Sequence, residues 1–509
     1  MATPRKQILQ ETFDECVAEN VADFDMSLEQ ATADAVQQFE SQGVDLSNII
    51  KNSVEGQEPL SGRLQQLLLE LRECLNLKKT GKNVLDVVMD LQRVCNQVPE
   101  ARVVAGRNDA VGTLLALLDT DSDAVVASCS TLLALLCTEN GDNQDVMGSA
   151  GMQRLVSILQ QKWETAETVV CALALVKAAC VKHESNKAQF TKTGGGEVLC
   201  SYFDQAKGDE VMLTSLARCL RVLTTNDDPC AMFSQAQDTI RVLVERHVIP
   251  YSLDILRQGE GCETASGPTL SLDLLVNWLA VLAQVAVTKE NCQQIADLDG
   301  LTAVQSVMRT YEDSAVVANR CIKLFRNVAA ADELKRVILQ CGSIEQTLLV
   351  MRRYESDASI QQNACATLGA VALRSPENSR VLVELGAIRH ISRAIQVHNR
   401  DVAVLRQASL AVRNMVARNV ELRSRFLHDE PKLEPLLREA QQYRGCGDEA
   451  YAALRDLGCD IQLSSFGVAA VAAGSISVPT TALRFNPVQL QSNELHDSVD
   501  EVSEASFSH

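Results

Sequence analysis

One nine-residue pattern recurs through the middle of the chain, and it constrains the fold more than any other feature. A small or apolar residue opens each copy, apolar residues occupy the fourth, fifth and eighth places, and a small residue closes it. We call the seventh place the ladder position. The copies place it at Leu135, Lys177, Val222, Gln284, Asn327, Ala370, Asn414 and Asp456. The spacings are 42, 45, 62, 43, 43, 44 and 42 residues. A period of about 40–47 residues indicates stacked helical repeats.

A second landmark lies upstream of most copies. There, a short predicted helix that begins near Asn or Asp runs to a glycine and is followed by an apolar helix; such segments start at Asn143, Asn186, Asn291, Leu334 and Asn378. Glycine supplies the left-handed turn that ends a short helix. Each repeat should therefore contain a short helix, a glycine corner, a longer helix, a loop and the longest helix. One repeat is too small to bury its apolar face, so the repeats must stack.

The spacing of 62 residues exceeds the period by about 19. The stretch from Arg257 to Ser271 has the Gly, Pro and Ser content of a loop, so we assign the excess to a loop at 257–271.

The flanks of the repeats differ from the array in composition. We expect an acidic N-terminal helical segment at 1–58, a degenerate capping repeat at 60–98, an array of about eight repeats at 99–460 and a disordered tail at 461–509. The first segment should hold helices at about 7–21 and 28–42. The second of these opens with a capping box of Ser27 and Gln30 and closes at Gly43. Asp90 interrupts the apolar pattern of the capping repeat.

Composition excludes several classes of protein. The formal net charge of −19 argues against a surface that grips nucleic acid or anionic lipid. No apolar run approaches ~18 residues, which excludes a transmembrane helix, and the first thirty residues lack the apolar core of a secretory signal. The 17 cysteines are scattered and odd in number, so we expect reduced thiols in the cytosol or nucleus.

Patterns for catalysis or metal binding are absent from the sequence. There is no CxxC, no HExxH, and no phosphate-binding loop after the glycines at 194–196. Cys129, Cys171 and Cys321 share the first place of the pattern and should be buried, where a free cysteine behaves as a small hydrophobe. We therefore expect no enzyme, no metal and no cofactor.

The order of three helices per repeat resembles the armadillo family rather than the two-helix HEAT type. This resemblance implies an all-α, right-handed superhelix whose third helices line a concave groove. The segment ATADAVQQFESQGVDLSNIIK, from Ala31 to Lys51, is similar to the N-terminal region of one branch of that family, which shares the acidic N-terminal helices, the array and the short tail. The resemblance also implies a role linked to haematopoietic progenitor differentiation.

In armadillo proteins that bind extended peptides, the ladder residue is usually Asn, and its amide pairs with the peptide backbone. Asn327 and Asn414 match that rule, and Gln284 could serve similarly. The bases expected on the same face are Lys177, Arg218, Arg221, Arg320, Lys323, Arg326, Arg406 and Arg413. They form either ordinary solvated helix faces or a groove for an acidic segment, held by amides and guanidinium groups. The acidic N-terminal helices could be such a segment within the same chain.

The leading hypothesis is a monomeric, non-enzymatic scaffold that binds an acidic segment of another protein, with neither nucleic acid nor membrane as partner. The alternative is an armadillo-type regulator, exchange factor or chaperone of a small GTPase. That role needs a large contact surface rather than a motif, so the sequence leaves it open.

Overall fold

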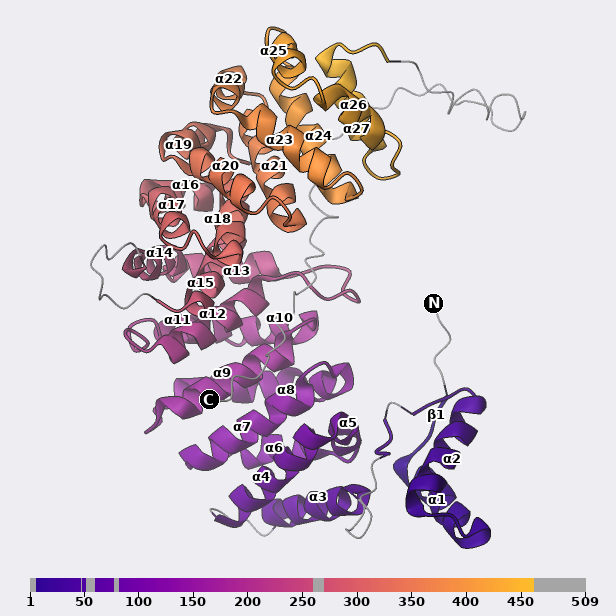
Figure 1. Ribbon diagram of the computed structural model, residues 1–509. Coiled ribbons are helices and arrows are strands. Elements are labelled where there is room, and N and C mark those ends of the chain that lie inside the picture. The colour runs from indigo at the N-terminus through magenta and orange to yellow at the C-terminus, as the bar shows by residue number, and fades with distance from the viewer. Residues whose placement is uncertain (1–5, 47, 52–59, 77–81, 260–269, 462–509) are drawn as a thin grey trace, which may run out of the picture. The chain divides into compact units, whose positions relative to one another are not determined.

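A computed structural model describes residues 6–46, 48–51, 60–76, 82–259 and 270–461 (Figure 1). The chain forms two compact units, Met1–Arg246 and His247–His509, which are described in turn. None of the helices in the described ranges is long and apolar enough to span a lipid bilayer. The tail predicted at 461–509 lies, after its first residue, outside the described residues.

In the first unit, two helices precede a long third helix in each repeat. A left-handed Gly148 separates the first two helices of the second repeat, which together form α8. The helices are α5 (Pro99–Arg107), α6 (Ala110–Leu117) and α7 (Asp123–Cys137); α8 (Gly141–Gln160) and α9 (Ala166–Cys180); α10 (Glu184–Lys192), α11 (Gly195–Ser201) and α12 (Glu210–Thr224); and α13 (Ala236–Glu245).

The second unit continues the same plan. Its helices are α14 (Val248–Gln258) and α15 (Leu272–Val285); α16 (Lys289–Asp297), α17 (Gly300–Thr310) and α18 (Ala315–Val328); the 3₁₀ turn η1 (Asp332–Leu334) with α19 (Lys335–Gln340), α20 (Ser343–Arg353) and α21 (Ala358–Ala372); α22 (Pro376–Glu384), α23 (Ala387–Val397) and α24 (Val402–Val416); and α25 (Leu422–Asp429), α26 (Leu433–Ala440) and α27 (Gly447–Leu457).

Within each unit the helices form layers. The third helices pack against one another in chain order, α7 on α9 and α9 on α12 in the first unit, and α15 through α27 in the second. The second helices form a neighbouring layer, in which α17, α20, α23 and α26 follow one another (Figure 1). Apolar residues from adjacent repeats bury one another: Cys321, Ile322 and Phe325 of α18 are fully buried. The predicted order of three helices per repeat matches this arrangement.

The corner between the first and second helices is left-handed in most repeats, but glycine does not always supply it. Gly194 and Gly386 have φ of 91° and 89°, as predicted. In the segment that starts at Asn291, Asp299 instead takes the turn, with φ 54°. A Cβ on the adjacent Gly300 would lie 2.7 Å from the carbonyl oxygen of Ile295. Glycine is therefore needed there for close packing, while aspartate tolerates the left-handed turn.

The excess of about 19 residues is divided between two loops, so its assignment to 257–271 alone was wrong. One loop joins α14 to α15, and its residues 260–269 lie outside the described residues. The other joins α12 to α13 and runs from Thr225 to Gln235. The equivalent connection between α15 and α16 has only residues 286–288.

The register of the pattern needs a correction of one residue in α9. Ala172 and Val176 are fully buried there, in the places that Cys129 and Leu133 take in α7. Cys171 is only half-buried, so the prediction that it lies in the core was wrong. The ladder position of α9 is accordingly Ala178, and Lys177 precedes it. Because small and apolar residues alternate in this alanine-rich helix, the nine-residue pattern fits its sequence equally well when it is shifted by one residue.

The N-terminal segment folds around its own small core. Helices α1 (Gln10–Phe24) and α2 (Leu28–Ser41) pack together, and Ser27 and Gln30 form the predicted capping box. The strands β1 (Lys6–Gln7) and β2 (Val44–Asp45), which the sequence did not predict, pair in parallel. The core contains Phe13, Val17, Ala31, Ala35, Val44, Leu46 and Ile49.

Two helices, α3 (Leu60–Asn76) and α4 (Lys82–Gln97), occupy the region predicted as a degenerate repeat. α3 packs on α6, and α4 packs on α7. Asp90 pairs with Arg63 at 3.0 Å and with Arg93 at 2.6 Å, which accounts for an acid within an otherwise apolar pattern.

Candidate partner-binding face

Acids and bases occupy different places on the third helices of the array. In α7, α9, α12 and α15 the acids stand in the first turn, at Asp123, Glu167, Glu210 and Asp273. Bases follow further along in α9, with Lys177, and in α12, with Arg218 and Arg221, while α7 and α15 contain none. α18 has Arg320, Lys323 and Arg326 and no acid, and α24 has Arg406 and Arg413 and no acid. Acids return near the ladder only in α27, with Asp456. A chain of net charge −19 thus keeps bases on most of its third helices.

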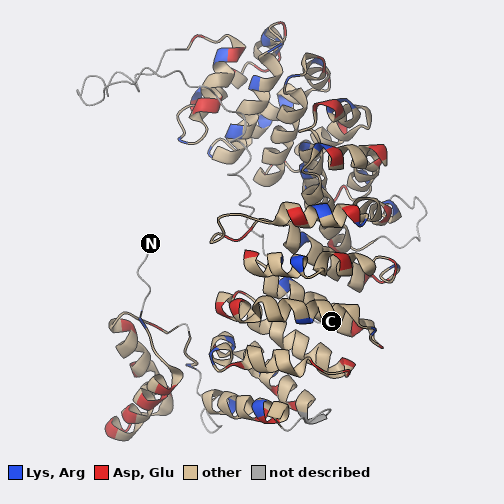
Figure 2. Cartoon of the chain, turned by 180° about the vertical axis from the view of Figure 1, so that it is seen from behind, with Lys and Arg blue, Asp and Glu red and all other residues tan. Residues whose placement is uncertain are grey.

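The acidic residues concentrate elsewhere. Residues 10–41, which contain α1 and α2, include nine acids and no Lys or Arg, and these helices are prominently red in Figure 2.

The ladder asparagines of the second unit bond to the neighbouring repeat. The side-chain Nδ2 of Asn327 donates to the carbonyl oxygen of Ala283 at 2.8 Å, and that of Asn414 donates to the carbonyl oxygen of Gly369 at 3.0 Å. Each bond joins one third helix to a third helix earlier in the stack. An amide has two N–H groups and a carbonyl oxygen. One N–H therefore fixes each side chain, while each Oδ1 has no hydrogen bond within the described residues.

Three of the arginines reach toward the next repeat. Arg326 donates to Oδ1 of Asn363 at 3.0 Å, Arg406 pairs with Glu449 at 2.9 Å, and Arg413 lies 3.5 Å from Asp456. The acids of α27 thus partly neutralise the bases of α24. Arg320 forms no ion pair with any described residue.

The corresponding face of the first unit has apolar ladder residues. Leu135 and Ala178 are half-buried, and Val222 is buried. Lys177 and Arg218 are exposed, and Arg221 is half-buried. This unit offers cations without ladder amides, so the structure brings amides and bases together only in the second unit. Gln284, the third predicted amide, is half-buried on α15 of that unit.

Sequence reasoning missed the polar groups that link repeats. Asn363 is buried, and its Nδ2 donates to Oδ1 of Asn319 at 2.9 Å. In the first helices, buried Asn186 donates to the carbonyl oxygens of Ala179 and Gln144 at 2.9 and 2.8 Å. Asn143, Asn291 and Asn378 make similar bonds to the preceding third helix. Their recurrence at the start of the first helix was the visible signal, although it was interpreted only as a helix boundary.

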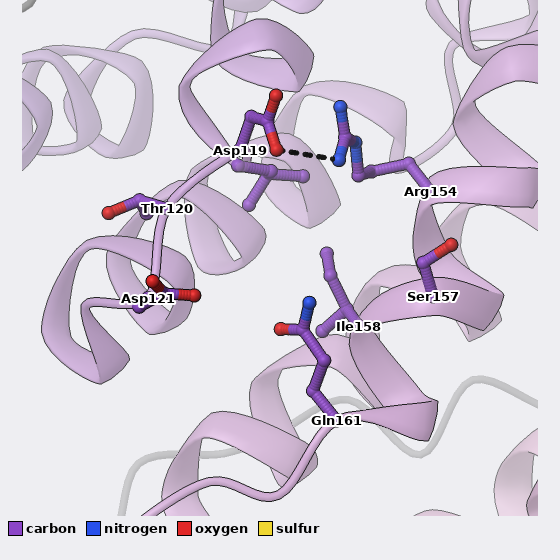
Figure 3. A pocket seen from close by; sticks show the side chains of 8 residues that line it. Asp119, Thr120, Asp121, Arg154, Ser157, Ile158 and Gln161 are labelled. Carbon is purple, nitrogen blue, oxygen red and sulfur yellow. Dashed lines mark hydrogen bonds and ion pairs between the residues drawn. The ribbon is translucent and has the colours of Figure 1, made fainter.

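Two hollows lie away from the third helices. The smaller, of about 140 Å³, lies between the end of α6 and the end of α8, and Arg154 there pairs with Asp119 at 3.1 Å (Figure 3). It is smaller than the ~300–1,000 Å³ typical of ligand pockets. The larger, of about 830 Å³, lies on α20 and α23 and mixes Arg352, Arg389 and Lys432 with Glu345 and Glu430.

The described cysteines and acids form no metal-binding cluster of three or more side chains. Burial raises the pKa of the Cys129 thiol to about 12, so it stays protonated near neutral pH.

Comparisons with known proteins agree with this architecture. The sequence model of the family described as ARMC6 matches residues 64–469, and that of the armadillo repeat-containing protein 6 N-terminal domain matches residues 5–64. Armadillo repeat-containing protein 6 from Homo sapiens is 29% identical over 368 residues, covering 69% of this chain and 70% of the relative. Its Drosophila melanogaster homolog is 27% identical over 359 residues, covering 70% and 75%.

Solved structures confirm the fold class. A structure from work on the phosphorylation switch that controls the interaction between cadherin and beta-catenin has a TM-score of 0.54 at 16% identity, covering 76% of this chain and 68% of that one. An engineered protein has a TM-score of 0.53 at 15% identity, covering 77% and 100%. With two family models spanning most of its residues, the chain belongs to the armadillo repeat-containing protein 6 family.

Proposed function

We propose that this protein is a non-enzymatic scaffold that binds an acidic segment of another protein on the third helices of its second unit. The armadillo fold supports protein binding in general, and the charge pattern supports the acidic partner.

One observation carries the proposal. α18 and α24 together have five bases and no acid, in a chain with 47 bases and 66 acids. Bases in the last turn, such as Arg326 and Arg413, also complement the helix dipole. Arg320, Lys323 and Arg406 stand before that turn, so the dipole does not account for them.

The ladder amides supply the second part of the recognition. Asn327 and Asn414 are oriented by their bonds to Ala283 and Gly369. Their remaining amide groups suit the N–H and C=O groups of an extended backbone. Guanidinium groups beside them suit carboxylates, because charge-assisted hydrogen bonds are stronger than neutral ones.

The test is a titration of the full-length protein with fluorescein-labelled peptides rich in glutamate, with lysine-rich peptides of equal length for comparison. Changing both Arg326 and Arg413 to Glu should weaken binding of the acidic peptides about a hundredfold or more, since each charge-assisted contact contributes roughly 1.5–3 kcal/mol. Binding to the unchanged protein should weaken as salt rises, because exposed charges are screened beyond ~8–10 Å.

The matched control changes Arg352 and Arg389 to Glu. These residues lie on α20 and α23 of the same unit and are exposed, so the net charge changes equally. The control should retain most of the affinity. Equal losses in both double variants would show that only net charge matters, and the proposed face would be wrong.

Four further expectations stay predictions: a role in haematopoietic progenitor differentiation, a location in cytosol or nucleus, a monomeric state and, as the alternative function, regulation of a small GTPase. The binding of nucleotide-free and nucleotide-loaded small GTPases to the protein distinguishes GTPase regulation from scaffolding, because a regulator should bind the two forms with different affinity.

A further inference from the structure

The loop between α12 and α13 presents two large apolar side chains to solvent. Met232 is 88% exposed and Phe233 is 83% exposed, the highest values among the large hydrophobic residues described. The next most exposed large hydrophobic residue of the array, Val211 at 64%, lies on helix α12. Adjacent apolar residues on one loop tip are unusual on a water-exposed surface, and clustered apolar exposure marks interaction sites.

Buried polar side chains of α10 hold the start of this loop in place. Lys187 is 2% exposed, and its Nζ donates to the carbonyl oxygen of Thr225 at 2.7 Å and pairs with Asp227. Glu184 is also buried, and its carboxylate lies 3.9 Å from Nζ of Lys187. Burying such charges is costly unless they are paired and hydrogen-bonded.

Both ends of the loop are held by the same short helix. The backbone N–H of Glu184 donates to Asp228 at 2.9 Å, and the backbone N–H of Gln235 donates to the Glu184 carboxylate at 2.6 Å. Between these points Asp228 also accepts from the N–H of Cys230 at 2.8 Å. The loop is therefore tied at its entry and its exit, while the segment between α12 and α13 extends away from these helices (Figure 1).

This loop is an insertion that the repeat itself does not need. The matching connection after α15 has only residues 286–288, and that after α9 only residues 181–183. A connection of three residues suffices to join the helices, so the extra residues and their anchors serve the tip. Fixing a loop in advance lowers the entropy that a partner must remove on binding.

The charge around the tip indicates the chemistry of the partner. Residues 222–240 contain Asp227, Asp228 and Asp238 and no Lys or Arg. Arg241 pairs with Asp238, but at the attachment to α10 the three acids Glu184, Asp227 and Asp228 face only one base, Lys187, so this side of the loop stays net acidic. Insertion into an anionic membrane would bring these acids against like charge. We propose that Met232 and Phe233 form an anchor that enters an apolar pocket, bordered by basic residues, on a partner protein.

The test places a photoreactive benzoyl-phenylalanine at position 233 of the full-length protein, with position 211 as the matched control. We expect adducts at position 233 that the control lacks, mapped to an apolar pocket with neighbouring Lys or Arg on the partner. The purified partner should then bind Phe233→Ser at least tenfold more weakly than the unchanged protein and should bind Val211→Ser equally well. Absence of position-specific adducts, or unchanged affinity of Phe233→Ser, would overturn the proposal.

A second variant tests whether the attachment of the loop to α10 contributes to binding. Asp227→Asn leaves the tip intact but removes its ion pair with Lys187, so hydrogen exchange at 225–235 should speed up and affinity should fall. If hydrogen exchange at 225–235 becomes faster and the affinity for the partner is unchanged, the attachment to α10 plays no part in binding.

Lipid vesicles test whether the tip enters a membrane instead of a protein pocket. Vesicles of phosphatidylcholine and phosphatidylserine serve as the probe, and the full-length protein should stay in the supernatant when they are sedimented. Cosedimentation that depends on Phe233 would assign the tip to a lipid surface and contradict a protein pocket.

Discussion

The two units use the same repeat but differ at the ladder position of their third helices. In the first unit the residues are Leu135, Ala178 and Val222, which cannot hydrogen-bond through their side chains. In the second, Ala370 is likewise apolar, but Asn327 and Asn414 bond to the backbone of the preceding third helix. The third helices of the first unit therefore stack without ladder amides, although Asn186 of α10 links neighbouring repeats there through its own side-chain amide. The amides of the second unit add orientation that stacking does not require, which is why we place the binding face there.

Thiol reactivity gives the largest expected difference within this comparison. Cys129 in the first unit and Cys321 in the second are fully buried, and burial raises the pKa of both thiols. Since only the thiolate reacts, both should label at least about a thousandfold more slowly at pH 8 than exposed Cys230. Mass spectrometry of a labelling time course measures the rates. Similar rates at Cys230 and Cys321 would contradict the buried third-helix core.

Introducing charge at the first place of the pattern tests the corrected register. Cys321→Asp puts an unpaired carboxylate in a fully buried site and should cost on the order of 3 kcal/mol or more. Cys171→Asp should cost much less, because Cys171 is half-buried. Hydrogen exchange in α18 and α9 reports each local opening free energy. Equal costs would restore the register that the sequence predicted.

Exchanging the ladder chemistry between units should have a smaller effect. Asn327→Val removes one hydrogen bond and should cost about 0.5–1.5 kcal/mol. Val222→Asn buries an amide and should cost roughly 1–3 kcal/mol unless it finds a partner. Hydrogen exchange in α18 and α12 measures both changes. If neither substitution changes the local opening free energy, apolar and amide ladder residues stabilise the stack equally.

The smallest expected effect is on the stability of the fold at acidic pH. A hydrogen bond from buried Lys335 holds the pKa of Asp332 below its usual value, with Lys335 Nζ and Asp332 Oδ1 2.7 Å apart. A carboxyl with a lowered folded-state pKa stabilises the fold above its unfolded value near 3.8, and this contribution is lost as pH falls through the folded value. Urea midpoints of the unchanged protein and Asp332→Asn should therefore differ by a small amount at pH 6 and converge toward pH 3. A difference that grows with acidity would show the opposite linkage.

The repeat period and the helix order could be predicted because stacking imposes them on the sequence. The period alone could not place every residue. In α9, small residues beside one another at Cys171 and Ala172 allow two registers, and only packing against α7 selects one. The spacing of 62 residues revealed an insertion without showing that it lies in two loops.

The candidate face was harder to predict than the fold. The sequence identified Asn327 and Asn414 as ladder residues, but it could not show that their Nδ2 atoms bond to Ala283 and Gly369, since these partners come from another repeat. The pairing of Arg413 with Asp456 likewise depends on how α24 and α27 stack. The buried Lys187 gave no signal, because its partners follow a helix some 40 residues later.

The most direct test of the proposed binding face is to locate a bound acidic peptide. A glutamate-rich peptide with a photoreactive group at its centre is cross-linked to the full-length protein, and the adducts are mapped by mass spectrometry. We predict adducts on α18, α21 and α24, beside Arg320, Asn327 and Asn414, and their loss at high salt. Adducts confined to α20 and α23, where the hollow of mixed charge lies, or to the loop at 225–235, would contradict the account.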